Sequence, residues 1–249
     1  MKAIIMAAGV GERLGLDYPK SLLRFAGKTL IERHIASLQR VGVGEVVLVI
    51  GYQADVVRAA LAALPAGGLS LSIRLVVNLE YQRGSVLSLK AAAAELRQGE
   101  DILLMDADVL YALPILQRLA DTPIANCFLI DRNFEPGDEP VKLCVREGQP
   151  VEFSKQPRAD IACDFAGESV GFFRFAAETA AALAECTERY AAAGCEDAPF
   201  EDAIRDLLFA QPQAFGFEDI TGLPWIEIDF PDDVERAERE ILPRIMTYE

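Results

Sequence analysis

A glycine-rich turn near the N-terminus has the residue types needed to hold a phosphate group. It reads Ala7-Ala8-Gly9-Val10-Gly11-Glu12-Arg13-Leu14-Gly15 and follows a short apolar run. Glycines at a strand end let backbone N–H groups approach a phosphate closely, and Arg13 and Lys20 add fixed positive charges. The turn departs from a dinucleotide fingerprint, which needs glycine in place of Leu14. Gly27-Lys28-Thr29 is similar to the end of a Walker A loop, but that motif needs glycine in place of Leu22. A tight turn with solvated cations is the structural alternative, but turn, arginine and lysine together favour phosphate binding.

Two carboxylates end a second apolar run, Leu103-Leu104-Met105-Asp106-Ala107-Asp108. Side chains two residues apart on a strand point to the same side, although a turn that begins there would separate them. Carboxylate oxygens are the hard ligands that Mg²⁺ requires beside a triphosphate. A polar strand end is the alternative interpretation. Asp106 and Asp108 are therefore candidate residues for a magnesium site.

The elements that must position these motifs alternate along the first half of the chain. Residues 2–7 and 46–50 are apolar without polar alternation, which is typical of strands buried on both faces of a parallel sheet. The pattern predicts an α/β fold with a mostly parallel, Rossmann-like three-layer sheet and binding sites at the carboxyl ends of the strands. The other expected strands are 71–77, 101–105 and 124–130, and the expected helices are 30–38, 55–64, 85–97 and 112–120.

Beyond residue 131 the alternation becomes looser. We find no repeat and no interdomain linker, so residues 1–249 are expected to form a single domain. The expected elements are a hairpin of 141–145 with 150–153 through Glu147-Gly148, an aromatic strand over 169–175, helices over 176–193 and 199–210, a strand over 225–228 and a helix that Pro231 opens.

The composition limits the class of ligand. Lys and Arg number 24 against 39 Asp and Glu, a net charge of −15, whereas a nucleic-acid binder needs a basic footprint. Residues 1–40 nevertheless hold seven basic and three acidic side chains, which suggests a small anionic ligand. His34 is the only histidine and lies at an apolar helical position. We interpret it as core packing, which excludes histidine-based triads and metal clusters.

The cysteines and the hydropathy indicate a cellular location. Five cysteines without a C-x-x-C pair indicate reduced thiols. No apolar stretch approaches the roughly 20 residues that a spanning helix needs. We therefore expect a cytoplasmic protein without membrane insertion, and the sequence leaves a homodimer open.

The N-terminal motif resembles a known enzyme family. Met6 to Leu14, followed by Pro19-Lys20-Ser21-Leu22, is similar to the A-A-G-x-G-(x)-R-L…P-K signature of the sugar-phosphate and small-phosphate nucleotidyltransferases. The resemblance implies the fold of the nucleotide-diphospho-sugar transferases. It also implies that a loop of Ala7, Ala8, Gly9 and Gly11 wraps a nucleoside triphosphate. Arg13 and Lys20 would then be the catalytic cations that touch its phosphate groups.

The same resemblance assigns a metal. The D-x-D of Asp106 and Asp108 is similar to the family's metal motif, whose second acid is the usual ligand. This implies that Asp108 binds Mg²⁺ while Asp106 belongs to the nucleotide site. Pro224-Trp225-Ile226-Glu227-Ile228-Asp229 resembles the family's closing motif, whose central aspartate is the second ligand. Asp229 would therefore share the Mg²⁺ cofactor with Asp108.

Two weaker resemblances concern specificity. Residues 78–89 resemble the base-recognition loop of the cytidylyltransferases, which implies that Ser85 and Ser88 lie near the base. The alternative is that Ser85 only caps the next helix. Lys155 follows the expected hairpin, where relatives use a lysine on the phosphate of the acceptor, although a solvated surface lysine fits equally. Glu168 and Trp225 complete the expected acceptor-binding set.

The resemblance divides the domain and implies an activity. Residues 1–130 would bind the nucleotide, 131–230 the acceptor, and 231–249 would form a C-terminal helix. The chain is most similar to the phosphocholine and inositol-phosphate cytidylyltransferases, which implies transfer of CMP from CTP, with release of pyrophosphate. The acceptor would be phosphocholine, an inositol phosphate, aminoethylphosphonate or a sugar phosphate. The alternatives are a sugar-1-phosphate nucleotidyltransferase that uses UTP, GTP or dTTP, a guanylyltransferase acting on a pterin cofactor, and a catalytically silent regulatory nucleotide-binding subunit.

Overall fold

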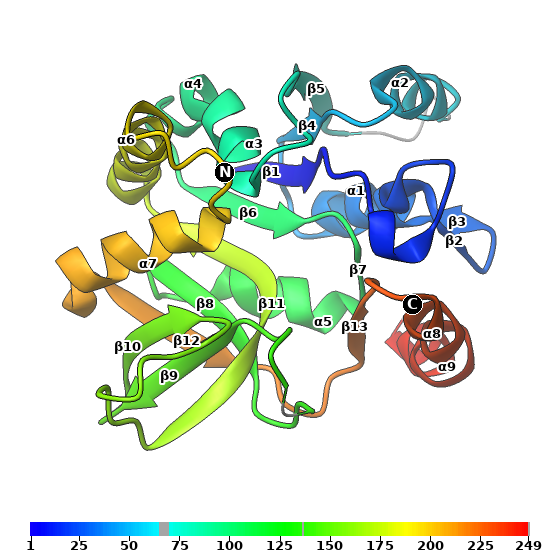
Figure 1. Ribbon diagram of the computed structural model, residues 1–249. Helices are drawn as coiled ribbons and strands as arrows, with labels where there is room; N and C mark the ends of the chain where they lie inside the picture. The colour runs from blue at the N-terminus through cyan, green and yellow to red at the C-terminus, as the bar shows by residue number, and fades with distance from the viewer. Residues whose placement is uncertain (65–69, 136, 249) are drawn as a thin grey trace.

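The computed structural model describes residues 1–64, 70–135 and 137–248. Within these ranges the central sheet has the strand order β10-β9-β11-β6-β1-β4-β5, with β8 paired to β11 and β12 paired to β8 (Figure 1). The strands are β1 (Lys2–Ala7), β4 (Glu45–Ile50), β5 (Ser72–Val77), β6 (Ile102–Asp106), β8 (Asn126–Asp131), β9 (Lys142–Arg146), β10 (Gln149–Ser154), β11 (Phe165–Phe175) and β12 (Phe215–Asp219).

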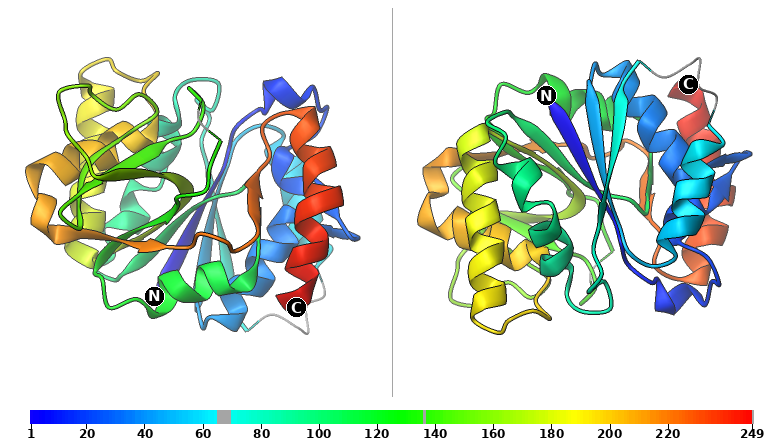
Figure 2. Two further views of the ribbon diagram at one scale, coloured as in Figure 1. Left: turned by 90° about the horizontal axis from the view of Figure 1, so that it is seen from below. Right: turned by 90° about the horizontal axis from the view of Figure 1, so that it is seen from above.

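The strands β6, β1, β4 and β5 form the parallel part of the sheet. Because successive side chains on a strand point to opposite faces, Ile4 and Leu104 belong to one apolar core, and Ile5 and Leu103 to another. Each core is closed by a layer of helices (Figure 2), which confirms the predicted three-layer α/β fold. One face carries α3 (Ser85–Ala91), α4 (Ala93–Leu96), α6 (Ala177–Ala192) and α7 (Phe200–Ala210), and the other α1 (Leu30–Arg40), α2 (Ala54–Ala62) and α5 (Leu113–Asp121).

The sheet changes direction at β11, which the sequence pattern does not predict. β11 is antiparallel to β6, β8 and β9. One of its edges pairs with β6 through Phe172–Phe175 and with β9 through Phe165–Glu168. The change of partner occurs around Gly171, whose φ of +75° a residue with a side chain rarely adopts. The mostly parallel order therefore holds for the N-terminal half, whereas β8 runs parallel only to β12, a strand that the sequence does not reveal.

The expected hairpin is confirmed as β9 and β10, which pair antiparallel. Its turn residues Glu147 and Gly148 both have positive φ angles, 52° and 74°, as a tight two-residue hairpin turn requires. The hairpin lies at one edge of the sheet and β5 at the opposite edge.

The C-terminal segment returns to the end of β6. β13 (Trp225–Glu227) pairs antiparallel with β7 (Val109–Tyr111), which follows β6 directly. A third apolar core, which includes Leu110, Ile226 and Ile228, fixes this pair under the C-terminal helix. The expected helix from 231 is described as far as residue 248 and consists of α8 (Pro231–Arg236), a wider π-type turn, α9 (Leu242–Ile245) and a final 3₁₀ turn. In the described ranges, no helix has both the length and the apolar character needed to cross a membrane.

Candidate active site

The glycine-rich turn follows β1 and is shaped around Lys20. Gly11 has a φ of +68°, and a Cβ placed on it would lie 2.5 Å from Lys20 Cγ. A side chain at this position would therefore displace the lysine as well as strain the backbone. Ala8 O accepts a hydrogen bond of 3.0 Å from Tyr52 N, which ties the start of the turn to the end of β4. The turn lies at the carboxyl edge of the parallel strands, as predicted.

Three carboxylates meet beside this turn. Asp108 lies in the bend between β6 and β7, and Glu227 and Asp229 lie at the end of β13; one oxygen of each lies within 4.8 Å of the others. Ile228 N donates a 3.0 Å hydrogen bond to Asp108 O, so the two backbone segments are directly joined. The structure thus brings Asp108 and Asp229 together as expected. It adds Glu227, which sequence reasoning missed although its position two residues before Asp229 signals that both face the same side.

Lys20 bridges two of these carboxylates. Its Nζ lies 2.8 Å from Asp108 Oδ2 and 2.6 Å from Asp229 Oδ1. Burial by itself lowers the Lys20 pKa, but the charges and hydrogen bonds of the two aspartates outweigh this effect and raise the pKa above its ordinary value. Glu227 lies beside these two aspartates. The three carboxylates of the site together outnumber the single ammonium group of Lys20.

Arg13 and Lys155 converge on one carboxylate oxygen. Arg13 Nη1 lies 3.0 Å and Lys155 Nζ 3.1 Å from Glu139 Oε2, and Arg13 is also 3.7 Å from Asp229 Oδ2. Hydrogen bonds from Lys155 and Arg13 hold the pKa of Glu139 below its ordinary value. Glu139 lies between β8 and β9, and nothing in the sequence signals its place. The contact links the two cations that the sequence assigns to the nucleotide and to the acceptor.

Asp106 is separated from the three-carboxylate cluster. It is the last residue of β6, and its carboxylate packs directly against the backbone of Gly171, which leaves no space for a Cβ there. Burial and the nearby charges of Asp108 and Glu201 raise its pKa well above the ordinary value. The bend at residue 107 therefore sends the two acids of the D-x-D motif to different surroundings.

Glu201 is a second acid that the sequence does not single out. It lies in the first turn of α7, and its Oε2 atom is buried without a hydrogen-bond partner in the described part of the chain. Burial raises its pKa to about 7. The charge of Lys155 lowers this pKa, and the charge of Asp108 raises it. A buried carboxylate oxygen without a partner is energetically costly. Glu201 therefore offers a carboxylate oxygen that no group in the described part of the chain satisfies.

The two serines of the expected base loop both contact protein groups. Ser85 Oγ accepts a 2.9 Å hydrogen bond from Phe200 N, and Ser88 Oγ accepts one of 2.9 Å from Asn78 Nδ2. The alternative that Ser85 caps α3 is wrong, because Gly84 is the N-cap residue and Ser85 is the first residue of the helix. Ser85 instead fixes the start of α7, the helix that carries Glu201.

Glu168 and Trp225 both lie next to the carboxylate of Asp131. Glu168 faces Asp131 across the β11–β8 pair, and Trp225 Nε1 donates a 3.0 Å hydrogen bond to Asp131 Oδ2. Burial, followed by repulsion from Asp131, raises the pKa of Glu168 to about 7. Two of the expected acceptor residues thus lie together, whereas Lys155 joins Arg13 through Glu139.

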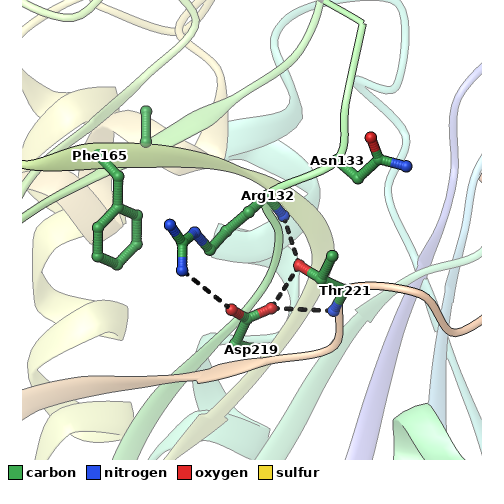
Figure 3. A pocket seen from close by; sticks show the side chains of 6 residues that line it. Arg132, Asn133, Phe165, Asp219 and Thr221 are labelled. Carbon is green, nitrogen blue, oxygen red and sulfur yellow. Dashed lines mark hydrogen bonds and ion pairs between the residues drawn. The ribbon is translucent and has the colours of Figure 1, made fainter.

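A surface hollow of about 310 Å³ lies at the ends of β8 and β12 (Figure 3). The Arg132 guanidinium stacks 4.2 Å from the centre of the Phe165 ring and lies 3.9 Å from Asp219 Oδ2, while Thr221 Oγ1 accepts a hydrogen bond from Arg132 N. Its charged groups contact one another, and its lining includes none of the predicted site residues. We therefore assign it no part in the reaction.

The buried side chain of His34 contacts the backbone of the D-x-D bend. It is fully buried, its Nε2 lies 3.2 Å from Ala107 O, and its ring packs against Tyr111 and Phe172. These contacts match its interpretation as a core residue. Burial lowers its pKa to about 4, so the unfolded chain binds a proton at a pH where the folded protein does not.

The contribution of His34 to stability is therefore expected to fall with acid, whereas Glu168 and Glu201, whose pKa values are raised to about 7, act in the opposite direction. His34 contributes stability that is complete above its unfolded pKa of about 6.5 and is lost as the pH falls toward 4. Between pH 7 and pH 5 the free energy of unfolding should decrease by about 2 kcal/mol through this group. Urea denaturation at both pH values measures the change. In His34→Gln, which keeps a donor for Ala107 O but does not titrate, the free energy of unfolding at pH 5 relative to that at pH 7 should be about 2 kcal/mol higher than in the original protein. The same pH dependence in both proteins would contradict the assignment.

Comparisons with known proteins identify relatives of this chain. The chain is 30% identical over 253 residues to the CMP-5'-(3-aminopropyl)phosphonate synthase of Streptomyces rubellomurinus, covering 98% of this chain and 39% of that protein. It is 30% identical over 246 residues to the bifunctional IPC transferase and DIPP synthase of Rubrobacter xylanophilus, covering 96% of this chain and 52% of that protein. The chain therefore spans about half or less of the length of these two relatives.

The fold has a close match among solved structures. The inositol-1-phosphate CTP transferase from T. maritima superposes with a TM-score of 0.76 at 22% identity, covering 98% of this chain and 95% of that one. The family model of the MobA-like NTP transferase domain matches residues 3–163, which include the glycine-rich turn, Lys20 and Asp108. Because this match covers more than half of the chain, the chain belongs to the family of MobA-like NTP transferase domains.

Proposed function

We propose that this protein is a Mg²⁺-dependent cytidylyltransferase that transfers CMP from CTP to a small phosphorylated or phosphonate acceptor. The observation that carries the proposal is the contact of Lys20 with Asp108 and Asp229 beside the glycine-rich turn. It joins a cation for phosphate groups to carboxylates for a metal ion in one place. The names of the Streptomyces relative and the T. maritima structure, which include CMP and CTP, support cytidine as the base.

The three-carboxylate cluster fits a magnesium ion. Asp108, Glu227 and Asp229 each offer a carboxylate oxygen within 4.8 Å of the others, and Mg²⁺ prefers such hard oxygen ligands together with substrate phosphates. When bound, the ion supplies positive charge that polarises the phosphoryl oxygens and orients the triphosphate.

The protein's own groups position the reactants and neutralise charge. An oxygen of the acceptor phosphate or phosphonate attacks the α-phosphorus in line; a new P–O bond forms, and the bond to the bridging oxygen of pyrophosphate breaks. The backbone N–H groups of the glycine-rich turn and Arg13 hold the β- and γ-phosphates. Lys20 neutralises charge that develops at the reacting phosphate. No covalent enzyme intermediate is needed, because positioning and charge neutralisation supply the rate enhancement.

The acceptor site favours a substrate with an amino group. Lys155 would hold the acceptor's phosphate or phosphonate, and the unpartnered Glu201 Oε2 lies within electrostatic range of Lys155 and Asp108. A buried carboxylate without a counter-ion favours a ligand that brings a positive charge. An aminoalkylphosphonate satisfies both requirements, and the Streptomyces relative is named for such a product.

Pyrophosphate release tests the proposal directly. Each of the four nucleoside triphosphates is combined with aminoethylphosphonate, phosphocholine, inositol 1-phosphate and a hexose 1-phosphate. We expect CTP with an amine-bearing acceptor to give the largest kcat/KM. The largest value for UTP, GTP or dTTP with a hexose phosphate would support the sugar-nucleotide alternative, and no release from any pair would support a silent regulatory subunit.

The cysteines of the chain are free thiols, which fits the cytoplasmic location that the sequence predicts.

Replacing Glu201 tests the contact with the amine. Glu201→Gln is expected to lower kcat/KM for the amine-bearing acceptor about tenfold, since a charge-assisted contact is lost, and to leave the value for inositol 1-phosphate nearly unchanged. Glu168→Gln tests the competing location, because Glu168 also belongs to the expected acceptor-binding set and is an acid with a raised pKa, but it faces Asp131. If only Glu168→Gln shows the acceptor-dependent loss, the amine binds at Glu168 and the assignment to Glu201 is wrong.

A further inference from the structure

We propose that Lys20 and the divalent cation compete for the same two carboxylates, so that the metal binds tightly only after a nucleotide has drawn Lys20 onto its phosphates. The inference rests on the proposed function, because it concerns the metal and the nucleotide of that reaction. Lys20 Nζ contacts one oxygen of Asp108 and one of Asp229 at 2.8 Å and 2.6 Å. These two side chains also belong to the three-carboxylate cluster that fits the metal.

Electrostatics forces the competition. The Lys20 side chain is 14% exposed, and those of Asp108 and Asp229 are 23% and 28% exposed, so solvent screens these charges only partly. A divalent cation added while Lys20 keeps its contacts would place like charges on shared ligands a few ångströms apart. The ammonium group must therefore leave before the metal can use both carboxylates fully.

The packing of Lys20 shows where its ammonium group can go. The aliphatic stem lies against Gly11, close enough that a Cβ there would be 2.5 Å from Lys20 Cγ and 2.7 Å from Cδ. This glycine belongs to the turn that is assigned to the triphosphate. Since the end of a lysine side chain is flexible, the ammonium group can exchange the carboxylates for the phosphates while the stem stays on the turn.

The exchange couples the two ligands. A nucleotide that attracts Lys20 frees the carboxylates for the metal, and by linkage a bound metal raises the affinity for the nucleotide by the same factor. Without Lys20 most of this coupling is lost, because Arg13, which lies 3.7 Å from Asp229 Oδ2, is then the cation that remains beside the two aspartates. The chain without Lys20 should therefore bind metal more tightly in the absence of nucleotide, although it loses a catalytic group.

Manganese binding without nucleotide tests this expectation. Free Mn²⁺ is measured by electron paramagnetic resonance during titration of the full chain. Lys20→Met is expected to bind Mn²⁺ about tenfold or more tightly than the original protein, because the competing charge is gone. The Mn²⁺ affinity of Lys155→Met should stay close to the original value. Lys155 is a lysine of the same site that contacts Glu139 instead of the carboxylate cluster. Adding Asp108→Asn to Lys20→Met should abolish the gain, which localises the ion.

An unchanged or weaker Mn²⁺ affinity in a folded Lys20→Met protein overturns the inference, and near-UV circular dichroism establishes folding. Lys20→Gln replaces it if the methionine variant unfolds. An equal gain in Lys155→Met also overturns the inference, since loss of any positive charge would then explain the result. The measurement needs no turnover. If Lys20→Met binds Mn²⁺ more tightly but the original protein transfers no nucleotide, only the proposed function is rejected. If the Mn²⁺ affinity of Lys20→Met is unchanged and the original protein is an active cytidylyltransferase, only the exchange is rejected.

Discussion

The Asp108→Ala protein is expected to fold normally and to release pyrophosphate at least about 10² to 10³ times more slowly than the original chain. Asp108 contributes one of the three carboxylate oxygens of the cluster and one of the two aspartate contacts of Lys20. Its loss would weaken metal binding and leave Lys20 to Asp229 alone. Continuous pyrophosphate detection at saturating CTP and acceptor measures the change in kcat.

A matched control for this substitution lies in the C-terminal helix. Asp232 is an exposed acid in the first turn of α8, where it only complements the helix dipole. Asp232→Ala should therefore retain nearly full activity. Substantial residual activity in a folded Asp108→Ala protein would reject the metal assignment.

Gly11→Ala is expected to lower kcat/KM for CTP about 10²-fold, since small displacements of a positioning group have effects of this size. Two physical effects combine at Gly11. Its φ of +68° is strained for alanine, and the new Cβ would lie 2.5 Å from Lys20 Cγ. The second effect pushes Lys20 away from the reacting phosphates. Steady-state kinetics with varied CTP measures the loss.

Gly15→Ala separates the two effects. Gly15 has a similar φ of +63°, but a Cβ placed on it meets no heavy atom within 4 Å. Both variants therefore carry the same backbone strain, about 1 kcal/mol, and only Gly11→Ala displaces Lys20. Equal losses of activity in the two variants would show that strain, and not the position of Lys20, controls the rate.

The N-terminal half of the fold was predictable because its rules are local. A parallel strand buried on both faces is continuously apolar, as β1 and β4 are, and the helix between them shows apolar residues at helical spacing. The carboxyl ends of parallel strands meet at one edge, so the glycine-rich turn and the D-x-D motif had to be neighbours. The tertiary structure confirms these elements.

The second half was less predictable because its partners are distant in sequence. β12 forms by pairing with the edge of β8, and β11 runs antiparallel to three different strands. Neither feature leaves a periodic pattern. Glu139 and Glu201 were missed for the same reason, since a single acid in a loop or a first helical turn is common and usually solvated.

The sequence by itself determined the chemistry that is available: a turn that admits phosphates, cations beside it, and acids at the ends of strands. Only the tertiary structure decided which charges meet. Lys20 reaches Asp108, 88 residues away, and Asp229, 209 residues away, and Glu139 joins Arg13 to Lys155. The physical reason is that local spacing fixes the direction of a side chain within its own strand or helix. Charge pairing, in contrast, depends on distances that exist only after the β6–β7 bend and the C-terminal strand have packed against each other.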